Sequence, residues 1–124
     1  VLGTAIEKNI GILNMYAVRR VLKDQKELRD IVADLIKEGQ IDPATVNQND
    51  PIGFLVDSGD AESIIEACYR FCRHEPGVSV LLTGTGNIEH LRQNLAAIEK
   101  GPLSDENLKK LNEIFGRVDS VSGN

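Results

Sequence analysis

The segment best suited to chemistry is the turn TGTGN at residues 83–87, which follows a short apolar run and precedes a helical pattern. Gly84 and Gly86 can adopt backbone conformations closed to other residues and let a ligand approach the main chain closely. The first amides of a helix have no partner within it, so a helix beginning at Asn87 would present an anion site suited to a phosphate group. Three polar side chains would add hydrogen bonds: Thr83, Thr85 and Asn87.

A Gly-x-Gly turn between a strand and a helix is weak evidence by itself, because many such turns bind nothing. The full dinucleotide fingerprint G-x-G-x-x-G is absent, since His90 and Leu91 follow where a further glycine would be expected. A Walker phosphate loop is excluded because no Gly-Lys-Ser or Gly-Lys-Thr occurs. The turn alone leaves phosphate binding and a purely structural role both open.

Two short apolar runs, residues 10–15 (IGILNM) and 78–82 (VSVLL), predict the strands that position this turn. Continuous apolar strands are typical of a parallel sheet covered on both faces, so we expect both to be buried. Helical sequence links them, which makes a βαβ unit of the α/β class. Residues 4–9 are predicted to be the tail of a helix that leads into the first strand.

Helices are predicted from apolar residues three and four positions apart, over residues 24–39, 60–74, 87–100 and 104–115. Asp24 and Ser104 suit the N-cap positions, and Glu27 suits the capping box. Gly39 suits the end of the first helix.

The same periodicity predicts which side chains face inward. In the second helix these are Ala61, Ile64, Ile65, Cys68 and Cys72, and in the third they are Ile88, Leu91, Leu95 and Ile98. Residues 41–59 are expected to form a loop with a short turn after Pro43, and residues 119–124 a frayed natural C-terminus.

Composition removes several classes of function. The chain has 124 residues and a formal net charge of -5, with acids and bases interspersed, so no basic stripe predicts nucleic-acid binding. No apolar run approaches the roughly 20 residues that span a bilayer, and the first residues lack a signal-peptide pattern, so the expected compartment is the cytoplasm. Cys68 and Cys72 have only His74 near them, so we expect two small apolar residues and no metal site.

Residues 89–94 (EHLRQN), directly after the turn, resemble the helix that follows the last strand of aldo-keto reductases. The resemblance continues through residues 96–98 and 102–104 to the apolar positions of the final helix. Upstream, residues 10–15 are similar to the seventh strand of the family, and residues 70–78 to the approach to the eighth. Residues 23–59 match least well.

The resemblance implies a (β/α)₈ (TIM) barrel that reduces aldehydes or ketones with NADPH or NADH and without a metal. Residues 1–124 would be a single C-terminal fragment of it, helix-rich with two short parallel strands: the seventh at about 10–15 and the eighth at about 78–82. Carried over by position, the adenosine-phosphate end of the cofactor would be surrounded by Gly84, Thr85, Gly86 and Asn87. Gln93 and Asn94 match an adenine-contacting pair. Met15 matches the position that packs against the nicotinamide ring, although a plain core methionine is an equal alternative.

Two departures from the family pattern matter. Members selective for NADPH have Arg or Lys at the position of His90, and a guanidinium fits a 2′-phosphate better than an imidazole does. The choice between NADP(H) and NAD(H) therefore stays open, since Arg92 or a partly protonated His90 could take the place of the missing basic residue. Arg19 and Arg20 could approach the pyrophosphate or be solvated surface.

The second departure concerns catalysis. The resemblance implies a catalytic Asp, Tyr, Lys and His on earlier strands, and nothing here matches them, since Tyr16 and Tyr69 lie in the wrong places. A full barrel needs about 250 residues. We therefore expect this chain alone to be inactive and to self-associate through its uncovered strands. The alternatives are a non-catalytic regulatory module with this fold and a small standalone nucleotide-binding domain.

Overall fold

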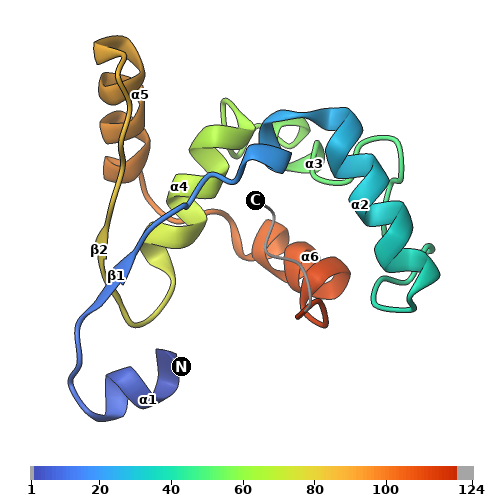
Figure 1. The fold of residues 1–124 in the computed structure, drawn as a ribbon, viewed down its shortest axis with the longest axis horizontal. Helices are drawn as coiled ribbons and strands as arrows, with labels where there is room; N and C mark the ends of the chain where they lie inside the picture. The colour runs from blue at the N-terminus through green and yellow to red at the C-terminus, as the bar shows by residue number, and fades with distance from the viewer. Residues whose placement is uncertain (1, 120–124) are drawn as a thin grey trace. The chain divides into compact units, whose positions relative to one another are not determined.

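The computed structural model describes residues 2–119, which form a helix-rich α/β structure (Figure 1). In chain order the elements are α1 (Leu2–Glu7), β1 (Ile12–Asn14), the 3₁₀ helix η1 (Arg20–Lys23), α2 (Gln25–Lys37), α3 (Phe54–Asp57), α4 (Ile64–His74), β2 (Val78–Leu81), α5 (Ile88–Glu99) and α6 (Asp105–Phe115). They divide into two compact units. The first contains residues 2–18 and 65–102, and the second contains residues 19–64 and 103–119. Of the frayed terminus expected at residues 119–124, residues 120–124 lie outside the described part of the chain.

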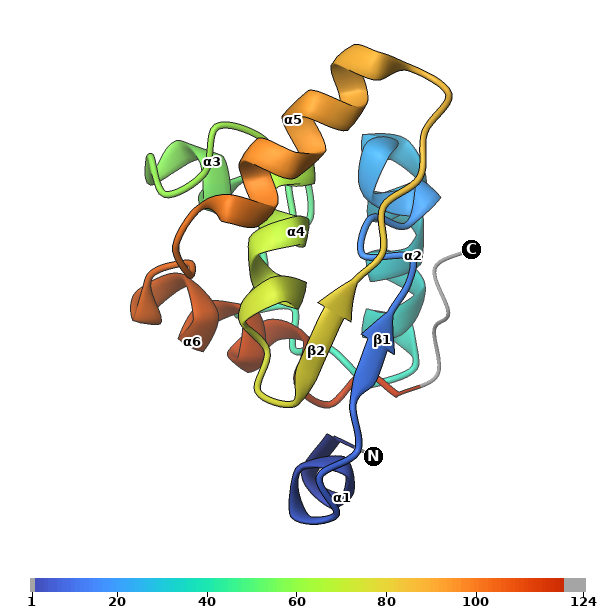
Figure 2. The ribbon, with the colours of Figure 1, turned by 90° about the vertical axis from the view of Figure 1, so that its left-hand side faces the viewer.

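The first unit is built on the parallel pair β1 and β2, as the βαβ pattern predicts (Figure 2). Leu13 pairs with Val80 and Asn14 with Leu81, after a register shift between Ile12 and Leu13. At this irregularity the amide of Ile12 donates to the hydroxyl of Ser79 at 3.1 Å, so a side chain completes the ladder where the backbone register slips.

One face of this sheet packs on helices. A small core forms from Ala17, Tyr69 of α4 and Ala97 of α5, with Leu81 of β2 against it. The other face is open: Leu13 is 62% exposed and its register partner Val80 is 45% exposed. The expectation that both strands are buried is therefore wrong for this chain, because within the first unit the helices pack on the side of Leu81 and leave Leu13 and Val80 exposed.

The inner faces of α4 and α5 also differ from the predicted stripes. On α4 the buried side chains are Glu66, Ala67, Tyr69 and Arg70, while Ile65 is exposed. α4 begins at Ile64, four residues later than the helix expected at residues 60–74. Ala61, just before the helix, is buried as predicted, and Cys68 and Cys72 are half-buried. Apolar periodicity missed Glu66 and Arg70 because they are charged and pair with each other.

On α5 the only buried side chain is that of Ala97. Leu91 and Ile98 are half-buried, whereas Ile88 and Leu95 are exposed, contrary to the predicted stripe. Within the described part of the chain, two of the four apolar residues of the α5 stripe are thus exposed to solvent.

The second unit begins with a well-capped α2. The carboxylate of Asp24 accepts hydrogen bonds from the amides of Glu27 and Lys26, and these bonds lower its pKa. Gly39 ends the helix at φ +74°, as predicted. Glu27 does not close a capping box, because its carboxylate pairs with Arg20 at 3.1 Å.

The segment 41–59 is irregular but packed. Ile41, Val46, Ile52 and Leu55 are all buried, and Leu55 belongs to α3, a short helix that the sequence did not reveal. The expected turn after Pro43 is present. Further on, Ser104 caps α6 by accepting from the amide of Asn107 at 3.3 Å, as predicted. Within residues 2–119 no helix is long and apolar enough to cross a membrane.

Candidate functional site

The turn predicted to bind the cofactor lies between the end of β2 and the start of α5. The amide of Leu82 donates to the carbonyl of Asn14 at 2.8 Å, so the pairing of the two strands continues up to the residue before the turn. Met15 directly follows β1 and is 57% exposed. Met15 and Thr83 therefore leave the same end of the sheet, the carboxyl end of two parallel strands.

The amides at the start of α5 are occupied by a side chain of the turn itself. The carbonyl oxygen of the Asn87 side chain accepts from the amides of Glu89 at 2.8 Å and His90 at 3.4 Å. The amide of Asn87 in turn donates to the hydroxyl of Thr85 at 3.1 Å. The expectation of unpaired amides is thus wrong here, because asparagine is among the best N-caps. An anion at this point would compete with the Asn87 carboxamide.

The two glycines of the turn differ from expectation as well. Neither Gly84 nor Gly86 has a positive φ, unlike Gly39, Gly59 and Gly77. A Cβ atom added at either would meet no atom within 4 Å. The backbone conformation of the turn therefore does not require glycine at these two positions. Because neither has a side chain, there is open space beside the exposed main chain of the turn.

A hydroxyl at the first turn residue joins three elements. The Oγ1 of Thr83 lies 2.8 Å from the Tyr69 hydroxyl on α4. The side-chain amide of Asn94 on α5 donates to the same Oγ1, also at 2.8 Å. Tyr69 is 7% exposed, so its hydroxyl is held at the edge of the small core. Sequence reasoning placed Asn94 in the site but missed Tyr69, whose only signal was an aromatic hydroxyl between the two cysteines of the apolar stripe.

The remaining predicted contacts lie in solvent. His90 and Gln93 are exposed on α5, and Arg92 is paired with Glu89 at 3.7 Å on the surface. Of the two arginines considered for the pyrophosphate, Arg20 pairs with Glu27. The structure thus brings Thr83 and Asn94 together and leaves His90 accessible.

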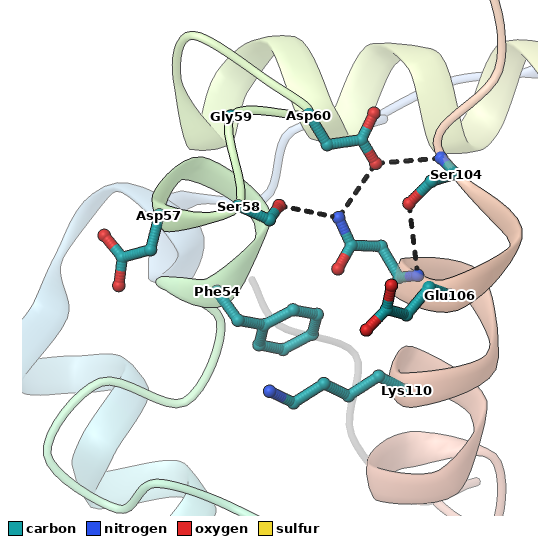
Figure 3. A pocket seen from close by; sticks show the side chains of 9 residues that line it. Phe54, Asp57, Ser58, Gly59, Asp60, Ser104, Glu106 and Lys110 are labelled. Carbon is teal, nitrogen blue, oxygen red and sulfur yellow. Dashed lines mark hydrogen bonds between the residues drawn. The ribbon is translucent and has the colours of Figure 1, made fainter.

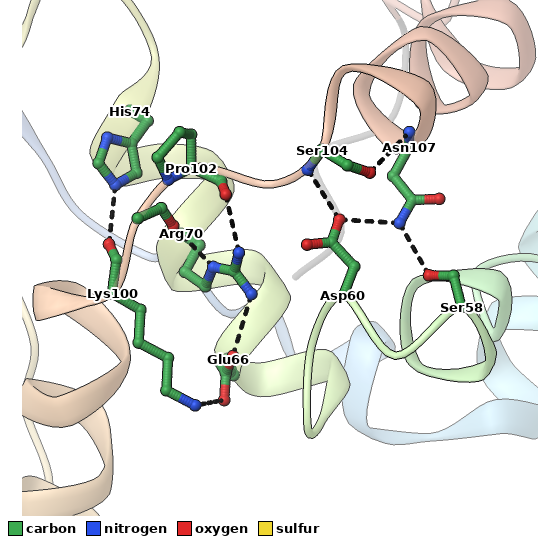
Figure 4. Close-up of polar contacts among 10 residues, drawn as sticks. Ser58, Asp60, Glu66, Arg70, His74, Lys100, Pro102, Ser104 and Asn107 are labelled. Atoms are coloured by element: carbon green, nitrogen blue, oxygen red, sulfur yellow. Dashed lines mark hydrogen bonds and ion pairs between the residues drawn. The ribbon is translucent and has the colours of Figure 1, made fainter.

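A second polar cluster in the first unit is structural (Figure 4). Arg70 bonds the carboxylate of Glu66 at 3.1 Å and the carbonyls of Gly101 and Pro102 at 2.8 and 2.7 Å. Lys100 reaches the other oxygen of Glu66 at 2.8 Å. These contacts fasten the end of α5 to α4 and so fix the helix that carries Asn94.

The two cysteines of the chain, Cys68 and Cys72, lie on α4. Burial, with a smaller contribution from Cys72, raises the pKa of the Cys68 thiol to about 12. Both cysteines are half-buried thiols. Among residues 2–119 no three His, Cys, Asp or Glu side chains are placed to hold a metal ion.

The second unit contains an open pocket at the start of α6, which holds none of the predicted site residues (Figure 3). The ammonium of Lys110 lies 4.2 Å from the centre of the Phe54 ring. The Asn107 side chain donates to Ser58 at 3.0 Å and to Asp60 at 2.8 Å. Ser58, Asp60 and Asn107 are thus engaged with one another, and their bonds join the end of α3 to α6.

Comparison with known proteins agrees with the class that the strands and the turn suggest. The pattern of the aldo/keto reductase family matches residues 2–115, which is nearly the whole chain. The chain therefore belongs to the aldo/keto reductase family, a family of oxidoreductases. Comparisons with curated proteins and with solved structures gave no significant match.

Proposed function

We propose that this chain is the C-terminal part of an NAD(P)H-dependent carbonyl reductase with a (β/α)₈ barrel, in which β1 and β2 are the seventh and eighth strands. The observation that carries the proposal is the meeting of Met15 and the turn 83–87 at the carboxyl end of two parallel strands. On barrels of this kind the active site is built at that end. The family match over residues 2–115 supports the same assignment.

In this proposal the turn and the first half of α5 hold the adenosine end of the cofactor. The open space beside Gly84 and Gly86 would admit a phosphate, with the Thr85 hydroxyl as a donor. The amides of Glu89 and His90 would join it only if the phosphate displaced the Asn87 carboxamide. Gln93 and Asn94 would contact adenine. The exposed thioether of Met15, beyond β1, would face the nicotinamide.

The cofactor, when bound, supplies the hydride, and the proton must come from a general acid that this chain does not provide. Tyr69 is buried and bonded to Thr83. Tyr16 is held at φ +62° after β1. The resemblance to the family places the general acid, with the lysine and aspartate that tune it, on strands that precede β1. We therefore propose that residues 1–124 contribute binding and that turnover of a small carbonyl substrate requires groups from elsewhere.

The proposal is tested by calorimetric titration of the 124-residue chain with adenosine 2′,5′-bisphosphate, the adenosine half of NADPH. We expect binding that Asn94→Ala weakens by about tenfold, as for the loss of one or two hydrogen bonds. Gln93→Ala should weaken it less.

The matched control is Gln48→Ala, which removes an exposed amide in the other unit. It should leave the affinity unchanged. Equal affinities for the wild type, the Asn94 variant and the Gln48 variant, or no binding at all, would contradict the proposal.

A further inference from the structure

We infer that Tyr69 is a positioning residue for adenine recognition, acting through Thr83 on Asn94. The inference rests on the proposed function, since it assigns a role to a residue behind the proposed adenine site. Tyr69 would not touch the nucleotide itself. Its hydroxyl would fix the direction of the side-chain amide that does.

The geometry is a relay through one hydroxyl oxygen. Tyr69 Oη and Asn94 Nδ2 each lie 2.8 Å from Thr83 Oγ1. The Tyr69 ring is packed in the small core with Ala17 and Ala97, which leaves its hydroxyl little freedom. Thr83 stands just beyond β2, so the relay connects α4, the strand end and α5.

A threonine hydroxyl can accept two hydrogen bonds and donate one. Thr83 can therefore serve Asn94 and Tyr69 at the same time, whichever of the two hydroxyls donates. With the Tyr69 hydroxyl present, the rotation of the Thr83 side chain is restricted. Without it, Thr83 would still meet Asn94, but nothing would hold its oxygen in one direction.

The consequence for Asn94 is a fixed amide. The terminal torsion of an asparagine is soft and roughly two-fold, so an unheld amide samples both orientations. Donation to Thr83 uses one N–H of Asn94 and leaves the carbonyl oxygen and the second N–H for a ligand.

The carbonyl oxygen and the second N–H of Asn94 match the hydrogen-bonding edge of adenine better than that of guanine. Adenine offers an acceptor at N7 and a donor at N6, which an asparagine amide can engage together. Guanine offers acceptors at both N7 and O6, so the Asn94 carbonyl would face a second acceptor. An amide held in one orientation would therefore prefer adenine, and a freely turning amide would lose much of that preference.

The test compares the affinities of AMP and GMP for the 124-residue chain by NMR titration. We expect the wild type to bind AMP more tightly than GMP. Tyr69→Phe keeps the ring and removes only the hydroxyl, and it should weaken AMP binding by about two- to threefold while changing GMP binding little, because the freed amide samples two orientations instead of one. The ratio of the two affinities is the decisive quantity, because a general loss of structure would lower both together.

Two further variants separate the relay from packing. Thr83→Val removes the central hydroxyl at nearly constant size and should reduce the ratio as Tyr69→Phe does. Thr83→Ser keeps the hydroxyl and should retain the ratio. Ile98→Val is the matched control, because it loses one methylene beside the same core and no hydrogen bond of the relay.

The outcomes distinguish the positioning role of Tyr69 from the proposed function of the chain. If the wild type binds AMP and Tyr69→Phe keeps the wild-type ratio, the positioning role is wrong and the proposed function stands. If the wild type binds neither nucleotide, the proposed function fails and the positioning role fails with it. A ratio lowered equally by Ile98→Val would also overturn the inference, since packing alone would then explain it.

Discussion

Leu13 and Val80 are register partners on neighbouring parallel strands, and both side chains are largely exposed. Partners in a parallel pair point to the same side of the sheet, so together they form an apolar patch on the face opposite the helices. Met15 and Leu82, two residues further along each strand, extend it and are 57% and 42% exposed. An apolar patch of this kind on two short strands favours association with another chain.

The first prediction is that the 124-residue chain self-associates. A two-stranded sheet is marginal by itself, and its edges and open face favour pairing with another chain. We expect light scattering at micromolar concentration to give a mass above 13.6 kDa. Val80→Lys should shift the mass toward the monomer, whereas Lys109→Ala on α6, in the other unit, should not. A compact monomer for the wild type would contradict the prediction.

The second prediction concerns the choice of cofactor. A guanidinium at the position of His90 would bond a 2′-phosphate in a bidentate manner, which an imidazole cannot do. His90→Arg should therefore tighten NADPH binding by about tenfold and leave NADH binding unchanged. Fluorescence titration with both cofactors measures the difference.

The control for this variant is His74→Arg, which adds the same charge on α4 of the same unit. It should change neither affinity by more than a small factor. If His90→Arg leaves both affinities unchanged, or tightens NADH equally, His90 does not lie at the 2′-phosphate.

The third prediction concerns the buried ion pair. Glu66→Ala would leave the guanidinium of Arg70, which is 7% exposed, without its carboxylate. Removing one partner of a buried pair destabilises a protein by about 3 kcal/mol or more. Urea unfolding should show this loss. Glu113→Ala, which breaks an exposed contact to Lys109 at 4.0 Å, should cost only a few tenths of a kcal/mol. Similar losses for the two variants would contradict a structural role for the cluster.

The fourth prediction concerns the dependence of stability on pH. The Cys68 thiol has a folded pKa of about 12, against about 8.5 for an unfolded cysteine. As the pH rises past the unfolded value, the unfolded chain releases this proton while the folded chain keeps it. The free energy of unfolding therefore falls with rising pH, and the stabilisation present below the unfolded pKa is lost as the pH approaches the folded one.

Urea unfolding between neutral pH and pH 10 measures this effect. Cys68→Ala should flatten the decline, and Cys72→Ala should leave most of it. Identical slopes for the wild type and Cys68→Ala would show that this thiol does not contribute.

Local signals in the sequence predicted local structure well. The caps at Asp24 and Ser104 and the glycine stop at Gly39 are confirmed, because each depends on hydrogen bonds or a torsion within a few residues. The parallel pairing of the two strands is confirmed for a similar reason, since a helical crossover between short apolar runs permits few topologies.

Features that depend on distant parts of the chain were not predictable. The inner face of α4 carries Glu66 and Arg70 because their partners, Lys100 and the carbonyls of Gly101 and Pro102, come some thirty residues later. The spacing of apolar residues does not reveal a buried charged side chain or the partner that it will have in the fold. It also cannot say whether an apolar face is covered, and so Ile88 was wrongly expected to face inward.

In the candidate site, too, the local feature could be predicted and the contacts between side chains could not. The turn itself was recognisable from its composition, but the occupation of the helix-start amides by Asn87 and the relay from Tyr69 to Asn94 were not. Both depend on side-chain directions that a sequence pattern does not carry.

The central claim is that the turn beyond β2 and the start of α5 receive the adenosine end of a nicotinamide dinucleotide. The most direct measurement is a map of NMR amide shifts during titration of the 124-residue chain with adenosine 2′,5′-bisphosphate. We expect the largest changes at residues 83–87 and at the side-chain amide of Asn94, with the Phe54–Lys110 pocket unaffected. Changes confined to that pocket, or spread evenly with no saturation, would contradict the account.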